Sequence, residues 1–428
     1  MEYQKIIRNW KEFELPELTP RELELPIYKD FITTISGPRR VGKTFLCFQK
    51  IKKLLEDGIS KENILYINFE DEKLINSDSK DLENLLNAFL EASELNKNQD
   101  LFLFLDEIQG VKNWDSWIRR VYDTKKEARI ILTGSSSKLL SREISTTLRG
   151  RVYNIEVFPL SFSEYLNWKG QNLKIKSILE GGKDSIIAKK YFQEYLFTGG
   201  YPAIFRNPQL KNEVLQSYYD SMIFKDIVER FKVSDVKKIQ ILAKLIFEST
   251  SREISYTNLS NKVKSLGFSM GKSTIIDYLS YFEEAYLFFQ VLKYEYSFQK
   301  QLGSIKKVYC IDNGLLNSVS FSFSENKGKL LENLVFLALR GAKKEVYYNR
   351  GKFECDFVVK EKNKVIQAIQ VTYELNSENR EREVKGLFEA MNKFKLKEGL
   401  ILTYNEEEKI EIDKKKIFVK PIWKWLLE

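Results

Sequence analysis

The stretch from Ile32 to Thr44, ITTISGPRRVGKT, constrains this chain more than any other part of its sequence. It fits the pattern G-x-x-x-x-G-K-[ST], whose fixed positions are Gly37, Gly42, Lys43 and Thr44. A short β-type run precedes the pattern, and FLCFQKIKKLL, with apolar residues at helical spacing, follows it. Strand, glycine-rich turn and helix form the context of a phosphate-binding loop, so the sequence predicts an α/β fold there. The alternative is a chance glycine turn.

Each part of this loop has a physical role toward a nucleotide. Gly37 and Gly42 allow a tight turn that points successive N–H groups at phosphate oxygens, and the following helix adds its positive end. Lys43 would neutralise the β- and γ-phosphates, and the Thr44 hydroxyl would ligate Mg²⁺. We therefore expect ATP and Mg²⁺ as ligands, with ATP contacting Gly37, Pro38, Arg39, Arg40, Val41, Gly42, Lys43, Thr44 and Phe45.

A second motif, LFLFLDE, places two carboxylates after a continuous apolar run, Leu101 to Leu105. Such a run is typical of a central parallel strand, and ligands bind at the carboxyl end of such strands. Asp106 is expected to hold Mg²⁺, directly or through water, and Glu107 to act as general base toward the attacking water. A solvated acidic strand end is the alternative, but the α/β pattern shared with Lys43 favours the catalytic interpretation.

Further polar residues follow the next expected strand, ARIILTGSSS. Thr133 or Ser135 could sense the γ-phosphate or hold the water, and a capped turn is an equal alternative. Arg149 and Arg151, in LRGR, could reach the γ-phosphate of a neighbouring subunit. The alternative for both arginines is a surface or packing role. The first interpretation predicts a homo-oligomer such as a hexameric ring.

Composition excludes several classes of protein. The 428 residues are too many for one core, so two to four domains are expected. Hydrophobic content is 43% and charged content 30%, which is typical of a globular chain. No apolar run is long enough to cross a membrane, and the N-terminus lacks the apolar segment of a signal peptide. The chain is therefore expected in the cytoplasm, without a membrane partner.

The reactive residues narrow the chemistry further. The chain has no histidine, which excludes Ser-His, Cys-His and histidine–metal chemistry. Its three cysteines, Cys47, Cys310 and Cys355, match no zinc or redox spacing and fit a reducing compartment. A net charge of +9, from 69 basic and 60 acidic residues, modestly favours a nucleic-acid partner.

Taken together, several stretches resemble the AAA-type ATPases of archaea and bacteria that carry a C-terminal domain of unknown function. The matching stretches are GPRRVGKT, LFLFLDEIQGVKNWDSWIRRVYD, ILTGSSSKLLS, LRGR followed by PLSFSEYL, and FTGGYPAIF. The resemblance implies an N-terminal segment with the P-loop ATPase core at residues 1–157 and a helical lid at 158–232. It further implies a winged helix at 233–300 and an α/β domain like the restriction-endonuclease fold at 301–428.

The pattern of residues also supports the expected winged helix. From Lys237 to Phe298 the pattern is helix, short polar helix, turn, helix and β-rich segment, with Lys272 to Tyr281 in the recognition position. Residues 232–277 hold eight Lys or Arg against four Asp or Glu. Candidates for DNA phosphate contacts are Lys262, Lys264, Lys272 and Ser273. A winged helix that serves only protein contacts is the alternative.

In the last region, Glu332, Asp356 and Gln370 resemble the order of metal ligands in the nuclease fold. The position of the nuclease lysine is occupied by Thr372, which removes a cation and predicts loss of cleavage. Lys360, Lys362 and Lys364 are expected in a hairpin turn, away from any metal.

These observations favour a Mg²⁺-dependent ATPase that couples hydrolysis to DNA binding, translocation or remodelling. A nucleotide-dependent switch that gates protein interactions, and an ATP-regulated nuclease, are the alternatives.

Overall fold

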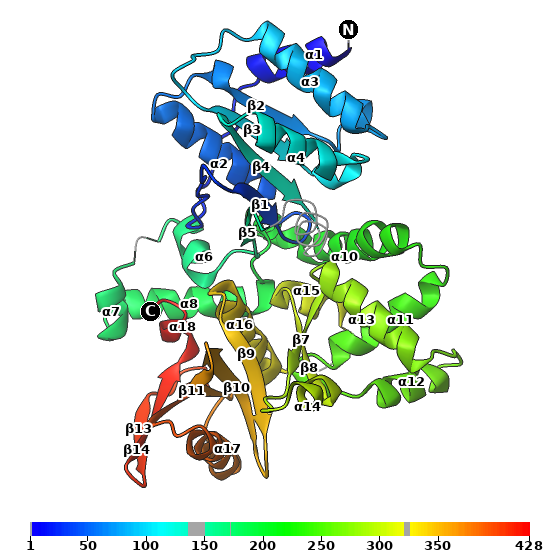
Figure 1. Ribbon diagram of the computed structural model, residues 1–428. Helices are drawn as coiled ribbons and strands as arrows, with labels where there is room; N and C mark the ends of the chain where they lie inside the picture. Colours follow the sequence, from blue (N-terminus) through cyan, green and yellow to red (C-terminus); the bar gives the residue numbers. More distant parts are fainter. Residues whose placement is uncertain (1, 136–149, 172, 321–325) are drawn as a thin grey trace. The chain divides into compact units, whose positions relative to one another are not determined.

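The chain folds into two compact units, residues 1–157 and residues 158–428. The computed structural model in Figure 1 describes residues 2–135, 150–171, 173–320 and 326–428. Each unit contains its own sheet structure, and each is described in turn.

The first unit is built on a five-stranded parallel sheet with the strand order β2-β3-β4-β1-β5. The strands are β1 (Ile32–Ser36), β2 (Ile64–Asn68), β3 (Leu101–Asp106), β4 (Ala128–Gly134) and β5 (Val152–Glu156). Every residue of the central strands β3, β4 and β1 is buried, whereas the edge strands β2 and β5 are partly exposed. The apolar run from Leu101 to Leu105 therefore forms a central strand covered on both faces, as the sequence predicted.

Helices cover this sheet. They are α1 (Glu2–Glu12), α2 (Lys43–Glu56), α3 (Ser79–Ala92) and α4 (Trp114–Thr124), with 3₁₀ turns at Lys61–Asn63, Glu72–Leu74 and Ile108–Gly110. With this strand order, the right-handed crossovers usual for parallel strands would place α2 on one face of the sheet and α3 and α4 on the other. Helix α1 packs against α3 and β2, where the Trp10 indole donates a 2.6 Å hydrogen bond to the Ile64 carbonyl.

The strand register brings the carboxyl ends of the central strands to one edge of the sheet. Asn68 pairs with Asp106, and Ser36 pairs with Gly134. Because the strands are parallel, the residues that follow β1, β2, β3 and β4 all lie at this edge. This is the α/β P-loop core that the sequence predicted.

The second unit begins with a helical region. Its elements are α6 (Phe162–Trp168), α7 (Ile175–Leu179), α8 (Lys183–Thr198), α9 (Pro202–Arg206), a 3₁₀ turn (Pro208–Leu210), α10 (Lys211–Ser221) and a π-helix (Met222–Glu229). A buried carboxylate joins this region to later elements: Asp312 accepts hydrogen bonds of 2.7 Å from the Gly200 N–H and 2.9 Å from the Leu315 N–H. Burial raises the pKa of Asp312 to about 6, although these hydrogen bonds partly offset the effect.

A small antiparallel sheet with the order β6-β8-β7 follows. The elements of this region are α11 (Val236–Glu248), β6 (Arg252–Ile254), α12 (Tyr256–Ser265), α13 (Lys272–Glu284), β7 (Phe288–Leu292), α14 (Phe298–Gly303) and β8 (Lys306–Cys310). The helix expected at Lys272 to Tyr281 is confirmed as α13. Strand β8 lies beyond residue 300, so one sheet contains residues from both sides of the expected boundary. The division into lid, winged helix and nuclease-like domain stays a prediction.

The chain ends in a mixed six-stranded sheet with the order β13-β14-β12-β11-β10-β9. Its strands are β9 (Glu345–Arg350), β10 (Glu354–Glu361), β11 (Lys364–Val371), β12 (Glu398–Thr403), β13 (Glu408–Ile412) and β14 (Lys415–Pro421). The accompanying helices are α15 (Asn313–Val319), α16 (Lys327–Gly341), α17 (Arg380–Lys393) and α18 (Ile422–Trp425). Helix α17 packs on β10, β11 and β12 and closes a hydrophobic core around Leu387, Ile401 and Ile417.

Candidate functional site

The predicted phosphate loop runs from the end of β1 to the start of α2. Gly37 has a φ of 155°, and a Cβ atom there would lie 2.3 Å from the Val157 carbonyl oxygen, so no larger residue fits. Gly42 has a φ of 96° and forms the N-cap of α2. Both conformations are readily adopted by glycine. The backbone therefore has the form that the motif predicted, with the N-terminus of α2 at the end of the loop.

Lys43 lies inside the loop. Its ammonium nitrogen is 3.1 Å from the carbonyl oxygens of Gly37 and Pro38 and 3.2 Å from Oε1 of Glu107. The whole residue is only 5% exposed. The ammonium is thus held between the loop and the end of β3, within reach of any phosphate that enters the loop.

Asp106 is surrounded by hydroxyl groups. Its Oδ2 accepts hydrogen bonds of 2.7 Å from Thr44 and 2.8 Å from Tyr66, and its Oδ1 accepts one from Thr133. Burial raises the pKa of Asp106 above its ordinary value, and the hydrogen bond from Thr133 partly offsets this. The pairing of a threonine hydroxyl with a carboxylate supplies the hard oxygen donors that Mg²⁺ prefers. Thr44 and Asp106 therefore fit the magnesium ligands expected from the sequence.

Glu107 follows Asp106 in a left-handed backbone conformation, with φ 55° and ψ 43°. Its N–H donates a 2.9 Å hydrogen bond to the Thr133 hydroxyl, and its carboxylate accepts one from the Gln109 amide. Burial would raise the pKa of Glu107, but the charge of Lys43, the hydrogen bond from Gln109 and the charge of Arg39 together outweigh it, so the pKa lies below its ordinary value. Glu107 is therefore ionised near neutral pH, as a general base must be.

The remaining loop residues are placed by neighbours of the first unit. Arg39 forms an ion pair with Glu70, which follows β2. Arg21 donates a 3.0 Å hydrogen bond to the carbonyl of Val41, whose own side chain is fully buried. Arg40 has a φ of 67°, and Phe45 is 46% exposed at the start of α2.

The candidate residues between β3 and β5 lie in different surroundings. Thr133 joins the carboxylate centre, and Ser135 is fully buried at the end of β4. Arg151 forms an ion pair of 2.8 Å with Asp123, and its guanidinium lies 5.3 Å from the Tyr122 ring centroid. Arg149 lies outside the described residues. A role of either arginine in a neighbouring subunit stays a prediction.

Two contacts at this site were missed from the sequence: the Tyr66 hydroxyl on Asp106 and the Gln109 amide on Glu107. The sequence offered a signal for Gln109, because its amide stands two residues after the expected base Glu107. Tyr66 was visible only as one aromatic residue of an apolar strand.

The candidate DNA contacts lie on α12 and α13 of the second unit. Lys262 and Lys264 are in the last turn of α12, and Lys272 and Ser273 begin α13. All four residues are exposed. They form a basic surface that stays a candidate for nucleic acid.

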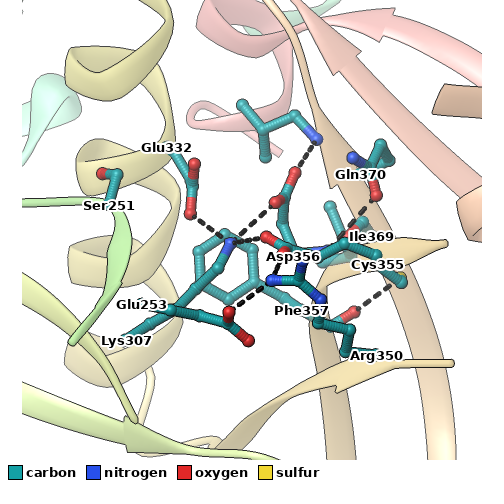
Figure 2. Close-up of polar contacts among 12 residues, drawn as sticks. Ser251, Glu253, Lys307, Glu332, Arg350, Cys355, Asp356, Phe357, Ile369 and Gln370 are labelled. Carbon is teal, nitrogen blue, oxygen red and sulfur yellow. Dashed lines mark hydrogen bonds and ion pairs between the residues drawn. The ribbon is translucent and has the colours of Figure 1, made fainter. Parts of the chain in front are cut away.

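The C-terminal candidates are only partly brought together, as Figure 2 shows. Glu332 on α16 and Asp356 on β10 converge, but Gln370 is bonded elsewhere. Its Oε1 accepts from the Asp356 N–H at 3.2 Å, and its Nε2 donates to Glu383 at 2.6 Å. Of the three expected metal ligands, Glu332 and Asp356 therefore lie at one point, and the expectation for Gln370 was wrong.

A lysine missed from the sequence occupies the point between these carboxylates. Lys307, on β8, places its ammonium nitrogen 2.9 Å from Glu332 and 2.9 Å from Asp356. Thr372, at the position of the nuclease lysine, donates a 3.0 Å hydrogen bond to the Glu374 carbonyl. The cation that seemed lost at Thr372 is thus present, but it comes from another strand.

The three lysines expected in a hairpin turn are placed differently: only Lys362 lies in the turn, while Lys360 lies in β10 and Lys364 begins β11. The two strands pair antiparallel, with Glu361 opposite Lys364 and Lys362 in the turn, and Lys360 forms a 2.9 Å ion pair with Glu345. Across the described ranges, no three or more Cys, Asp and Glu side chains are arranged to hold a metal ion. Nor does any helix in these ranges have the length and apolar character needed to span a membrane.

Comparison with protein families divides the chain into three parts. Residues 29–166 match an AAA domain (AAA_14), residues 189–326 match a domain of unknown function (DUF8612), and residues 327–425 match a second one (DUF4143). The first part contains the phosphate loop and the carboxylates of β3, so the P-loop core is an AAA-type ATPase domain.

Among solved structures, the Walker-type ATPase PABY2304 of Pyrococcus abyssi is similar over 74% of this chain and 94% of its own. The sequence identity is 13% and the TM-score is 0.44.

Two relatives are similar along nearly the whole chain. "Uncharacterized protein MJ1544" of Methanocaldococcus jannaschii is 39% identical over 99% of this chain and 94% of its own length. An "Uncharacterized protein" of Haemophilus influenzae is 30% identical over 93% of this chain and 95% of its own. The chain therefore belongs to the family of these two proteins, with an AAA domain followed by the domains DUF8612 and DUF4143.

Proposed function

We propose that the chain is a Mg²⁺-dependent ATPase. The observation that carries this proposal is the convergence of four side chains at one edge of the sheet. Lys43 lies 3.2 Å from Glu107, and Thr44 lies 2.7 Å from Asp106. A cation that could bind phosphate, two oxygen groups that could hold a metal and a carboxylate that could act as base thus lie next to one loop.

In this proposal the nucleotide phosphates accept hydrogen bonds from the backbone N–H groups of residues 37–44. Thr44 and Asp106 would hold Mg²⁺, which when bound supplies positive charge against the phosphate oxygens. Glu107 accepts a proton from water as the water oxygen bonds to the γ-phosphorus. The bond from that phosphorus to the bridging oxygen breaks, and ADP and phosphate leave.

The contact between Lys43 and Glu107 links nucleotide binding to activation of the base. In the structure the ammonium is shared by two loop carbonyls and the carboxylate. A phosphate in the loop would draw the ammonium toward itself, because it carries more negative charge than the carboxylate. Glu107 would then be free to accept the proton of the water, so ATP itself prepares the base.

We further propose that ATP hydrolysis is coupled to binding, translocation or remodelling of DNA. Lys262, Lys264, Lys272 and Ser273 are exposed on α12 and α13 and could meet phosphates without unfolding. The net charge of +9 adds a general attraction to nucleic acid. A homo-oligomer in which Arg151 serves the neighbouring site is part of this proposal, as is a cytoplasmic location.

The test is ATP turnover by the full-length protein with single-stranded, duplex and branched DNA. Turnover that rises with one of these DNAs is the expected result. Slow turnover with tightly retained ADP and no response to DNA would favour a nucleotide switch that gates protein contacts. No turnover with any DNA, at any Mg²⁺ concentration, would overturn the ATPase proposal itself.

A further inference from the structure

Three carboxylates converge on a single lysine in the second unit (Figure 2). We call Glu332, Glu354 and Asp356 the carboxylate cluster. The Lys307 ammonium nitrogen lies 2.9 Å from Glu332, 2.6 Å from Glu354 and 2.9 Å from Asp356. Each of its three hydrogens thus has an oxygen within hydrogen-bond distance.

The cluster is largely buried, although one of its carboxylates reaches the surface: the Glu354 side chain is 30% exposed. The Lys307 side chain is 2% exposed, and those of Glu332 and Asp356 are 12% and 7% exposed. Further donors occupy the carboxylates: the Tyr309 hydroxyl lies 2.7 Å from Glu332, and the Val371 N–H lies 2.9 Å from Asp356.

The charges explain why a cation must be present. Buried carboxylates that face one another are stable only with a compensating positive charge or a proton. Lys307 supplies that charge at the centre, and Arg350 pairs with Glu354 from the outer side. Burial, together with the charge of Asp356, raises the pKa of Glu332 to about 8 despite Lys307.

The distances around Lys307 are those of ion pairs, and the distances in a calcium centre are shorter. Calcium binds carboxylate oxygens at roughly 2.3–2.6 Å with flexible geometry, whereas magnesium requires about 2.0–2.1 Å. The ammonium–oxygen distances of 2.6 to 2.9 Å lie just above the calcium range. As they stand, the described carboxylates are therefore not arranged to hold a metal ion, and they would have to move toward the centre to bind calcium in place of the ammonium.

We propose that Lys307 is the resident cation of the carboxylate cluster, in the place that a divalent metal would take. The lysine comes from β8 of the three-stranded sheet, and its partners come from α16 and β10. It therefore also fastens the small sheet to the six-stranded sheet. Two consequences follow: the natural protein binds no divalent ion at this point, and loss of the lysine creates a metal site.

The experiment is calorimetric titration of Ca²⁺ into the full-length, nucleotide-free protein. Four proteins are compared: the natural chain, Asp356→Asn, Lys307→Ala, and Lys307→Ala with Asp356→Asn. Lys307→Ala is expected to gain one calcium site that the double variant lacks, while the natural chain and Asp356→Asn behave alike. Lys306→Ala is the matched control, because Lys306 contacts the Tyr256 hydroxyl instead of the cluster and should gain no site.

Two results would overturn the proposal. One is calcium binding by the natural chain that Asp356→Asn abolishes, since lysine and metal would then coexist. The other is a folded Lys307→Ala protein that gains no site. If Lys307→Ala unfolds, Lys307→Met keeps the volume of the side chain, and its folding should be restored by millimolar Ca²⁺ but not by K⁺ at equal ionic strength. Failure of Ca²⁺ to restore either variant would equally contradict the exchange of cations.

Discussion

The ammonium nitrogen of Lys43 lies 3.2 Å from Oε1 of Glu107, and these side chains are 4% and 10% exposed. The lysine proposed to bind phosphate and the proposed base are therefore in direct contact. Each holds the other in place, since an unpaired charge in this position would be costly. The contact makes both residues sensitive to changes in the other.

Glu107→Gln should separate binding from hydrolysis. Glutamine keeps the size of the side chain but cannot accept the proton of the attacking water, so turnover should fall by about 10²–10⁴-fold. ATP should still bind, because Lys43 and the loop are unchanged and Lys43 loses a competing anion. Fluorescent-nucleotide binding and phosphate release measure the two effects, with Lys43→Ala expected to weaken binding itself. Near-normal turnover by Glu107→Gln would remove Glu107 from the role of base.

Tyr66→Phe should weaken the response to magnesium. Burial and the charge of Asp106 raise the pKa of Tyr66 far above its ordinary value, so its hydroxyl stays protonated and donates to Asp106. A hydrogen bond to a charged group is worth about 1.5–3 kcal/mol. Its loss should raise the Mg²⁺ concentration for half-maximal turnover several-fold, with little change at saturation. Tyr28→Phe, at an exposed tyrosine, is the control, and identical magnesium curves for both variants would contradict the prediction.

Arg151 offers a test of assembly. If it serves the site of a neighbouring subunit, it must leave its 2.8 Å pair with Asp123. Inactive Lys43→Ala protein mixed with inactive Arg151→Ala protein should then regain activity, because mixed interfaces combine two intact halves. Lys43→Ala mixed with Glu107→Gln is the control, since every site in that mixture is damaged. Turnover by a demonstrated monomer, independent of concentration, would exclude an action between subunits.

The basic surface of α12 and α13 should make DNA binding depend on salt. Lys264→Glu with Lys272→Glu should weaken binding to any sequence, and the slope of log affinity against log salt should shrink by about 0.9 per lost phosphate contact. Lys397→Glu with Lys416→Glu makes the same change of charge at two other exposed lysines and should have a smaller effect. Fluorescence anisotropy at several salt concentrations measures both. An equal loss of DNA affinity in the two double variants would indicate that DNA is attracted by the overall charge and not by a specific binding surface.

Asp312 should make the second unit less stable as the pH rises. Burial raises its pKa from 3.8 to about 6, so the folded state takes up a proton that the unfolded chain lacks between these values. The resulting stabilisation is complete at low pH and is lost as the pH rises through about 6, by about 3 kcal/mol in all. Urea unfolding of the natural chain and of Asp312→Asn should show this loss only in the natural chain. Parallel pH profiles would contradict the assignment.

The nucleotide site was predictable because its residues are local in the sequence. The loop from Gly37 to Thr44 lies within one turn, and Asp106 and Glu107 are adjacent at the end of one apolar strand. Parallel pairing then brings the two segments to the same edge without further information. The contact of Tyr66 with Asp106 depends instead on the register of β2 against β3, which the residue pattern does not specify.

The carboxylate cluster shows the opposite case. Lys307 stands beside Lys306 in KKVYC, and nothing local distinguishes the buried lysine from its partly exposed neighbour. Its partners Glu332 and Asp356 are 25 and 49 residues away along the chain. Only the packing of β8 against α16 and β10 brings these charges together. The motif order suggested a missing cation because it tests for a lysine only at position 372. It cannot show that a lysine on another strand, Lys307, supplies the charge.

The three-stranded sheet also bears on how this gene could have been inherited. The family boundary between residues 326 and 327 leaves Lys307 in one domain and Glu332, Glu354 and Asp356 in the next. A recombination at that boundary would pass on the lysine without its anions, or the anions without their lysine. Each half would then carry uncompensated buried charge. The two domains are therefore expected to descend together, and exchanges between relatives should succeed only when both come from the same parent.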